Sequence, residues 1–160
     1  MTEVFVGLGS NIEPEKHLRW ALAELGHHFG KLDVSGVYRS PAFGFDGPDF
    51  LNMVVRFDTG ADADAVEAVL SSLENECGRD DGARNGSRTL DLDLLLFGER
   101  IDAGRRLPRR DILIYPFVLA PLAELAPDLD STPHNWYFAQ AHGAVFVRMA
   151  LLATILKVFV

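Results

Sequence analysis

The sequence has only one cysteine, Cys77, so it cannot form an intrachain disulfide framework or a cysteine metal cluster. Basic residues are also scarce: 15 Lys and Arg stand against 23 Asp and Glu, and the net charge of −8 argues against a nucleic-acid-binding protein. A signal-peptide pattern is missing from the first residues, where strand-forming residues begin at Val4. We therefore expect a cytoplasmic protein.

Long apolar runs are rare as well. The tail from Val145 to Val160 is strongly apolar, broken only by Arg148 and Lys157, but it is too short to predict a membrane span. We interpret it as a packing element, or as a surface for self-association of an otherwise monomeric protein; membrane insertion is the less favoured alternative. The overall composition, 48% hydrophobic and 24% charged over 160 residues, is ordinary for one globular domain.

The periodicity of the apolar residues predicts the element order β-α-β-β-α-β. Short or alternating apolar segments predict four strands, at residues 4–8, 32–38, 50–58 and 88–97. Helical spacing predicts two helices, the first capped by Asn11 and ended by Gly30, the second from Asp62 to Cys77. This order is that of a ferredoxin-like α+β fold, with a mainly antiparallel sheet and both helices on one face. The other face is left for loops and a ligand, and C-terminal additions include a helix at 117–125.

The segment from Arg88 to Phe97 carries the strongest chemical signal. A strand directs alternate side chains to opposite faces, so Asp91 and Asp93 share one face while the leucines around them enter the core. At about 3.3 Å per residue the two aspartates stand roughly 6.6 Å apart, which suits two hard cations shared with phosphate oxygens. Arg88 can bind the same phosphates through its guanidinium. The alternative is a half-exposed strand with solvated acids.

Seven short motifs follow one another between residues 3 and 129: Gly9-Ser10-Asn11, Tyr38-Arg39-Ser40-Pro41, Phe50-Leu51-Asn52, Glu74, Gly78-Arg79, Arg88-Thr89-Leu90-Asp91-Leu92-Asp93, and Phe117-Val118-Leu119 followed by Pro121-Leu122. Each is weak alone. Their order and spacing together resemble the 6-hydroxymethyl-7,8-dihydropterin pyrophosphokinase family of folate biosynthesis. We treat 1–160 as one domain, in which the tail at 130–160 shares no part of the resemblance.

The resemblance implies transfer of pyrophosphate from ATP, the co-substrate, to a reduced pterin, with release of AMP. Asp91 and Asp93 would hold two Mg²⁺ ions and Arg79 and Arg88 would clamp phosphates, so these four are the expected catalytic residues. The nucleotide would be bound by a wider set: Glu74, Arg79, Arg84, Arg88, Arg106, Arg109 and Arg110. The pterin would be bound by six residues, two of which sandwich its ring: Phe50 and Phe117, with Asn52, Ser40, Pro41 and Phe43.

The residues themselves support part of this picture. Phe50 and Asn52 share a strand face, as an aromatic floor with a nearby polar group requires, and Asn is depleted in strands. The structural alternatives are that Phe50 and Phe117 belong to the core and that Arg79 caps the second helix at its C-terminal end. No residue stands out as a general base, and the five histidines have no recognisable catalytic spacing.

Three positions depart from the family pattern. Asn85 stands where the family usually has a tryptophan in a lid loop, Arg109 where it often has a histidine, and Tyr115 where it has a basic residue. Two other functions therefore stay open: a noncatalytic pterin- or nucleotide-binding paralogue with a degenerate lid, and a small interaction domain that uses the apolar tail. Retention of both aspartates and both phosphate-clamping arginines favours the enzyme, because binding a pterin alone needs none of them.

Overall fold

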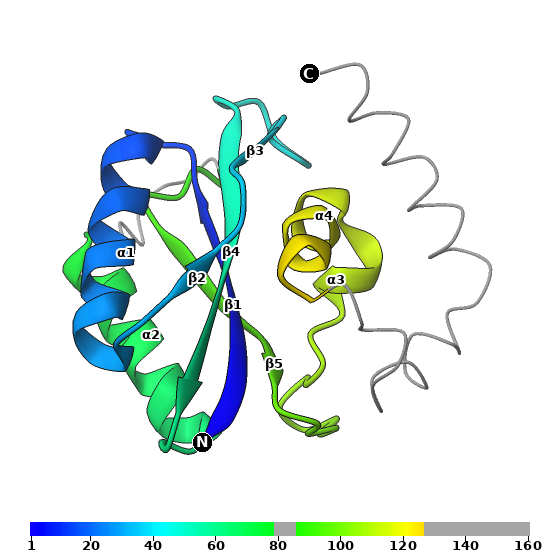
Figure 1. Ribbon diagram of the computed structural model, residues 1–160. Coiled ribbons are helices and arrows are strands. Elements are labelled where there is room, and N and C mark those ends of the chain that lie inside the picture. Colours follow the sequence, from blue (N-terminus) through cyan, green and yellow to red (C-terminus); the bar gives the residue numbers. More distant parts are fainter. Residues whose placement is uncertain (79–85, 127–160) are drawn as a thin grey trace.

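The computed structural model describes residues 1–78 and 86–126, which form one antiparallel sheet with helices on both of its faces (Figure 1). The sheet has the strand order β2-β4-β1-β5, and β3 also pairs with β4. The elements along the chain are β1 (Thr2–Ser10), α1 (Pro14–Phe29), β2 (Asp33–Val34), β3 (Tyr38–Ser40), β4 (Phe50–Thr59), α2 (Ala63–Glu76), β5 (Asp91–Phe97), α3 (Asp111–Ile114) and α4 (Pro116–Leu125). The predicted ferredoxin-like α+β fold is confirmed.

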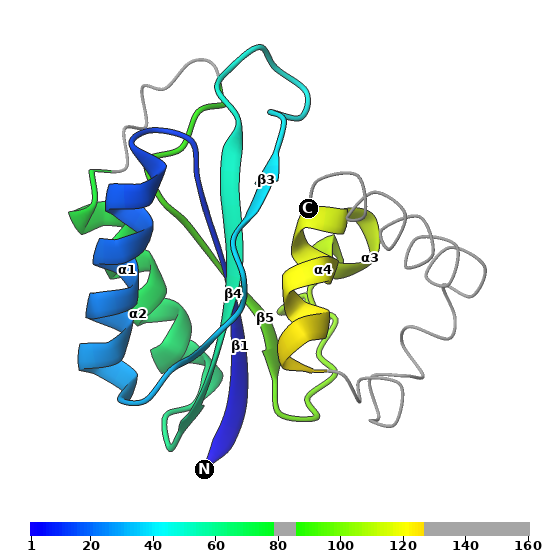
Figure 2. The ribbon, with the colours of Figure 1, turned by 45° about the horizontal axis from the view of Figure 1, so that its top comes forward.

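Helices α1 and α2 lie together on one face of the sheet, as the sequence predicts (Figure 2). The core beneath them contains the inward positions of β4 and β5, including Val55, Leu92 and Leu94. Asp62 caps α2 by accepting a hydrogen bond from Ala65 N–H at 2.9 Å. Cys77, at the end of this helix, is half-buried against the same core.

The opposite face is not left to loops and a ligand alone, because α3 and α4 cover part of it (Figure 1). Val54 of β4 and Ile112 of α3 belong to the second core cluster there. A shift of register between Phe5 and Val6 leaves Leu95 as the extra residue of β5, and both Leu95 and Leu96 then join this second cluster. The sheet therefore has a buried core on both faces.

The second predicted strand, 32–38, is divided into β2 and β3. Ser35 lies between them, where its hydroxyl accepts a hydrogen bond from Val54 N–H at 2.9 Å. Gly36 N–H donates to the carboxylate of Glu124 in α4, 2.8 Å away. These contacts replace the regular strand pairing, so the two short strands lie along different parts of β4.

Two further predictions are wrong in detail. Asn11 does not cap α1: the residue before this helix is Glu13, which has a left-handed backbone and no side-chain capping bond. The side chain of Asn11 is instead buried and bonded to Arg88, as described below. Arg88 itself precedes β5, which begins at Asp91. No helix within 1–78 and 86–126 is both long and apolar enough to cross a bilayer; the apolar tail lies outside the described residues.

Candidate active site

A cavity of about 330 Å³ opens where β1 ends and where β4 and β5 begin. All six residues predicted to bind a pterin line it, together with three of the residues predicted to bind metal or phosphate. These nine are Ser40, Pro41, Phe43, Phe50, Asn52, Phe117, Arg88, Asp91 and Asp93. Gly9, Asn52 and Asp91 converge here because β1 lies between β4 and β5.

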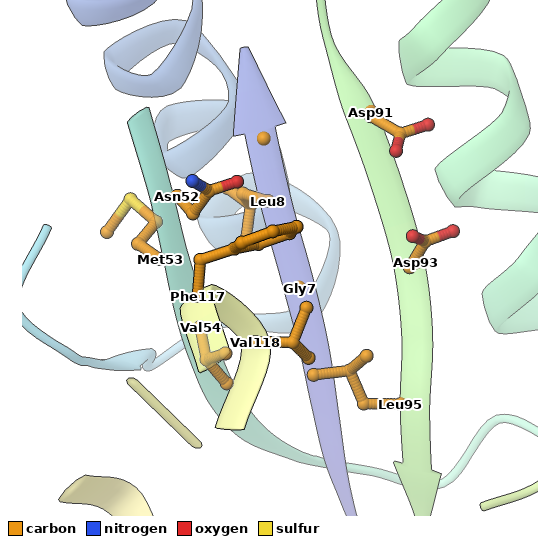
Figure 3. A pocket seen from close by; sticks show the side chains of 11 residues that line it. Gly7, Leu8, Asn52, Met53, Val54, Asp91, Asp93, Leu95, Phe117 and Val118 are labelled. Carbon is orange, nitrogen blue, oxygen red and sulfur yellow. The ribbon is translucent and has the colours of Figure 1, made fainter. Parts of the chain in front are cut away.

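Gly9 of β1 lies at the floor of the cavity. Gly9 pairs with Asn52 on one side and with Asp91 on the other. A Cβ atom on Gly9 would lie 3.3 Å from Asn52 Oδ1, so a side chain at position 9 would fill the space in front of the Asn52 amide. Gly7, two residues before Gly9 in β1, pairs with Val54 on one side and with Asp93 on the other. It lines a smaller hollow of about 60 Å³ that extends the cavity (Figure 3). From the sequence, Gly9 is identified only as part of the Gly9-Ser10-Asn11 motif, and this role was missed.

Aromatic rings form the walls. Phe50 and Phe117 are half-buried at the cavity, so they are not core residues as the structural alternative held. Tyr115 stacks on Phe117 with ring centroids 5.0 Å apart, and Phe45 meets Phe50 edge to face at 6.2 Å. Sequence reasoning missed Phe45 and Tyr115 as wall residues, although two phenylalanines in a loop rich in glycine and proline, Phe43 and Phe45, were a visible signal.

Asn52 presents an oriented amide to this cavity. Its side chain is only 7% exposed. The Nδ2 group donates to Ser40 Oγ at 2.9 Å and to the Tyr38 carbonyl at 3.3 Å, which fixes the nitrogen on that side. The Oδ1 atom faces Gly9, and within residues 1–78 and 86–126 no group donates a hydrogen bond to it. Asn52 therefore offers a buried acceptor to a ligand with an N–H edge.

The two aspartates stand on the same side of β5, across β1 from Asn52 (Figure 3). Burial, followed by the negative charge of Asp91, raises the pKa of Asp93 to about 7, against the opposing effect of Arg109. The guanidinium of Arg109 lies 2.8 Å from Asp93 Oδ1. Two carboxylates on one cavity wall fit a hard divalent cation, which prefers oxygen ligands. Since no group of three or more possible metal ligands occurs in the described part of the chain, the rest of such a coordination shell must come from elsewhere.

The arginines predicted to bind the nucleotide divide into two groups at two cavities and a third group outside the described residues. Arg88 is exposed at the rim of the 330 Å³ cavity, while Arg106, Arg109 and Arg110 line a second cavity of about 510 Å³. Asp111 borders both cavities. The predicted phosphate-binding residues Arg79 and Arg84, and the lid position Asn85, lie outside the described residues.

Comparison with known proteins decides the family. The family model described as 7,8-dihydro-6-hydroxymethylpterin-pyrophosphokinase (HPPK) matches residues 5–127. The chain belongs to the HPPK family. A 2-amino-4-hydroxy-6-hydroxymethyldihydropteridine pyrophosphokinase of Pseudomonas aeruginosa is 43% identical over 133 residues, which cover 79% of this chain and 82% of that protein. One of Synechocystis sp. is 41% identical over 129 residues, 77% of this chain and 66% of the relative. The folate synthesis bifunctional protein of Pisum sativum is 37% identical over 150 residues, 88% of this chain and 28% of that protein.

Within this HPPK chain, Asn11 connects three segments around the cavity. Its Oδ1 accepts from Arg88 N–H at 2.7 Å, and its own N–H donates to the Arg88 carbonyl at 3.1 Å. Its Nδ2 donates to the Pro48 carbonyl at 3.2 Å and to Ser87 Oγ at 3.3 Å. With 3% exposure, Asn11 holds the backbone of Arg88 against the end of β1. Sequence reasoning missed this role because it assigned the residue to a helix cap.

Glu74, another residue of the HPPK resemblance, lies beneath β5. It is 7% exposed, and its Oε1 accepts a hydrogen bond from Leu92 N–H at 2.8 Å. It lines none of the three cavities described above. Its predicted contact with the nucleotide stays a prediction, while its position supports the strand that carries both aspartates.

Proposed function

We propose that this HPPK-family chain transfers the pyrophosphoryl group of ATP to the hydroxymethyl group of 6-hydroxymethyl-7,8-dihydropterin. In this reaction the hydroxyl oxygen forms a bond to the β-phosphorus of ATP, and the bond from that phosphorus to the α-phosphate oxygen breaks. AMP leaves, and the hydroxyl proton passes to solvent. The observation that carries the proposal is the pairing of Gly9, which has Asn52 on one side and Asp91 on the other. One cavity thus joins an aromatic pocket with an amide acceptor to a pair of carboxylates.

The pterin half of the cavity recognises a flat ring with polar edges. Phe50 and Phe117 offer aromatic faces to such a ring, whose stacking would add to the burial of its apolar surface. Asn52 Oδ1 can accept a hydrogen bond from the amide or amino edge of the pterin, because its Nδ2 is already held by Ser40 and Tyr38. Ser40, Pro41 and Phe43 close the pocket from the loop side.

The phosphate half has two carboxylates on its wall and an arginine at its rim. We assign Asp91 and Asp93 to the binding of two Mg²⁺ ions, which when bound would neutralise charge on the triphosphate and orient it. Arg88 at the rim can donate two parallel hydrogen bonds to phosphate oxygens. The three arginines of the neighbouring 510 Å³ cavity provide further positive charge for the nucleotide. These residues act by positioning and by electrostatic stabilisation, which dominate phosphoryl transfer.

The test is incubation of the purified chain with ATP, Mg²⁺ and 6-hydroxymethyl-7,8-dihydropterin, followed by chromatography of the nucleotides. We expect AMP and the pterin diphosphate in equal amounts. Asp91→Asn and Asp93→Asn should each lower turnover on the order of 10²- to 10³-fold, as loss of a charge-stabilising group does. Asp58→Asn changes an exposed acid on β4 and should keep normal turnover. Pterin binding without AMP would favour the noncatalytic paralogue, and ADP as product would mean transfer of a single phosphoryl group.

A further inference from the structure

The side chain of Arg109 bridges two carboxylates at the boundary between the two larger cavities. Its Nη2 lies 2.8 Å from Asp93 Oδ1, and its Nε lies 2.7 Å from Asp111 Oδ2. Its backbone N–H donates to the Leu95 carbonyl at 3.0 Å, which holds the residue beside β5. Two of the three guanidinium nitrogens, Nη2 and Nε, are therefore engaged by carboxylates, and the backbone of Arg109 is anchored to the strand that carries Asp93.

This ion pair lies on a carboxylate that we assign to metal binding. The side chains of Asp93 and Arg109 are 28% and 32% exposed, so the pair is only partly screened by solvent. A cation that approaches Asp93 meets one carboxylate oxygen already engaged and a fixed positive charge next to it. Like charges at such short range repel, and the repulsion is strongest where water is partly excluded.

Arg109 also borders a cavity in which its guanidinium could bind another partner. It lines the 510 Å³ cavity together with Arg106 and Arg110, while Asp93 lines the 330 Å³ cavity. A triphosphate that spans the boundary between the cavities would bring phosphate oxygens within reach of the guanidinium. Phosphate is a strong bidentate partner for arginine, so it can replace a carboxylate in this role.

We infer that Arg109 is a positioning residue that keeps free divalent cations off Asp93 and releases this carboxylate when a triphosphate offers its guanidinium another partner. The inference rests on the proposed function. Arg109 thereby couples binding of the cation to binding of the nucleotide, and the coupling is reciprocal because it is a free energy shared between two sites. If the ion pair only joined the 109–111 segment to β5, Arg109 would bind Asp93 equally with and without nucleotide. It would then create no coupling between the two ligands.

The test compares two binding measurements, each begun with protein from which metal ions have been removed. Binding of Mn²⁺ without nucleotide is followed by electron paramagnetic resonance. Binding of an ATP analogue with a methylene group between the α- and β-phosphorus is followed by calorimetry in saturating Mg²⁺. Arg109→Gln should raise the affinity for free Mn²⁺ and lower the affinity for the analogue, each by about tenfold, within the usual range of coupling between sites. Changes of opposite sign are not expected from a general loss of structure.

Arg105→Gln is the matched control. Arg105 also bridges carboxylates, those of Asp64, Glu67 and Asp102, and its replacement changes the net charge by the same amount. It should leave the Mn²⁺ affinity unchanged. Arg109→Lys keeps the charge but lacks the planar fork whose Nη2 and Nε contact Asp93 and Asp111, so its Mn²⁺ affinity should lie between those of the wild type and Arg109→Gln.

The outcomes separate the inference from the function on which it rests. Failure of the wild-type protein to bind the analogue with Mg²⁺ would refute the proposed function. Normal binding by the wild type, with an Mn²⁺ affinity in Arg109→Gln that is unchanged or lower, would refute the inference alone. Should Arg109→Gln fail to fold, the Lys variant decides: an Mn²⁺ affinity no higher than that of the wild type overturns the role of Arg109.

Discussion

The carboxylate of Glu74 accepts a hydrogen bond from the backbone N–H of Leu92, 2.8 Å away, midway between Asp91 and Asp93. Helix α2 thus supports β5 from the side opposite to the cavity. Since both aspartates project from the same short strand, a shift of its backbone would move them together. The precision of the acidic site depends in part on a residue that does not reach the cavity.

Glu74→Ala should therefore affect both stability and catalysis. Leaving Leu92 N–H without this acceptor should lower the free energy of unfolding by about 1–3 kcal/mol, measured by urea denaturation. Turnover should fall by up to about 10²-fold, as a misplacement of reacting groups by about 1 Å can cause. Glu76→Ala, which alters an exposed residue of the same helix, should change stability by less than about 0.5 kcal/mol. A Glu74→Gln variant of normal stability with a raised KM for ATP would instead indicate direct contact with the nucleotide.

Asn11→Ala should release the backbone of Arg88. The Arg88 N–H loses its acceptor in this variant, so its hydrogen exchange should become faster by on the order of 10-fold or more, since 1.4 kcal/mol corresponds to a factor of ten. The KM for ATP should rise, because Arg88 is proposed to bind phosphate. Asn75→Ala, an exposed asparagine in α2, serves as the control. Unchanged exchange at Arg88 would show that Asn11 does not hold this segment.

The sequence predicted the parts of the site that depend on local periodicity. Alternation along β4 and β5 placed Asn52, Asp91 and Asp93 on the cavity face, because the period of a strand is set by its own backbone. Contacts between distant segments could not be read in this way. The division of β2 from β3 depends on Glu124, 88 positions beyond Gly36. The role of Asn11 depends on Arg88, 77 positions away.

The covering of the second sheet face escaped prediction for a related reason. Helix α4 is almost wholly apolar and contains Pro121, so its sequence shows no clear amphipathic stripe that would indicate a partner. Only the burial of adjacent residues in different clusters, such as Val54 with Val55 and Leu94 with Leu95, shows that the sheet has two buried faces. Strand alternation alone assigns one face to the core and leaves the other to solvent.

Asn52→Ala should weaken pterin binding without weakening the binding of Mg-ATP. Loss of the buried acceptor Oδ1 should cost about 1–3 kcal/mol of binding free energy for the pterin, measured by calorimetry. Ser40→Ala removes the hydroxyl that orients the amide, at 2.9 Å from Nδ2, and should cause a smaller loss. An equal loss of affinity for both ligands would contradict the assignment of Asn52 to the pterin edge.

The last prediction concerns Asp93 in the metal-free protein. Its pKa is raised from 3.8 to about 7, first by burial and then by the charge of Asp91. Between pH 4 and pH 7 the folded state therefore holds a proton that the unfolded state has released, so the contribution of Asp93 to the free energy of unfolding falls as the pH rises through this range. The fall is at most about 1.4 kcal/mol per pH unit and is reduced by the partial exposure of the carboxylate.

Urea denaturation in EDTA at several pH values between 4.5 and 7.5 tests this slope. Asp93→Asn cannot titrate, so the stability of the wild type relative to this variant should decline steadily over that range. The attraction of Arg109 is already contained in the raised pKa of Asp93, which it partly opposes, and arginine stays charged throughout, so the sign of the slope does not change. Asp58→Asn replaces an exposed acid on β4, and its free energy of unfolding should change with pH as that of the wild type does. Parallel curves for Asp93→Asn and the wild type would mean that Asp93 is already ionised in the folded protein at pH 4.5, and that burial does not set its charge.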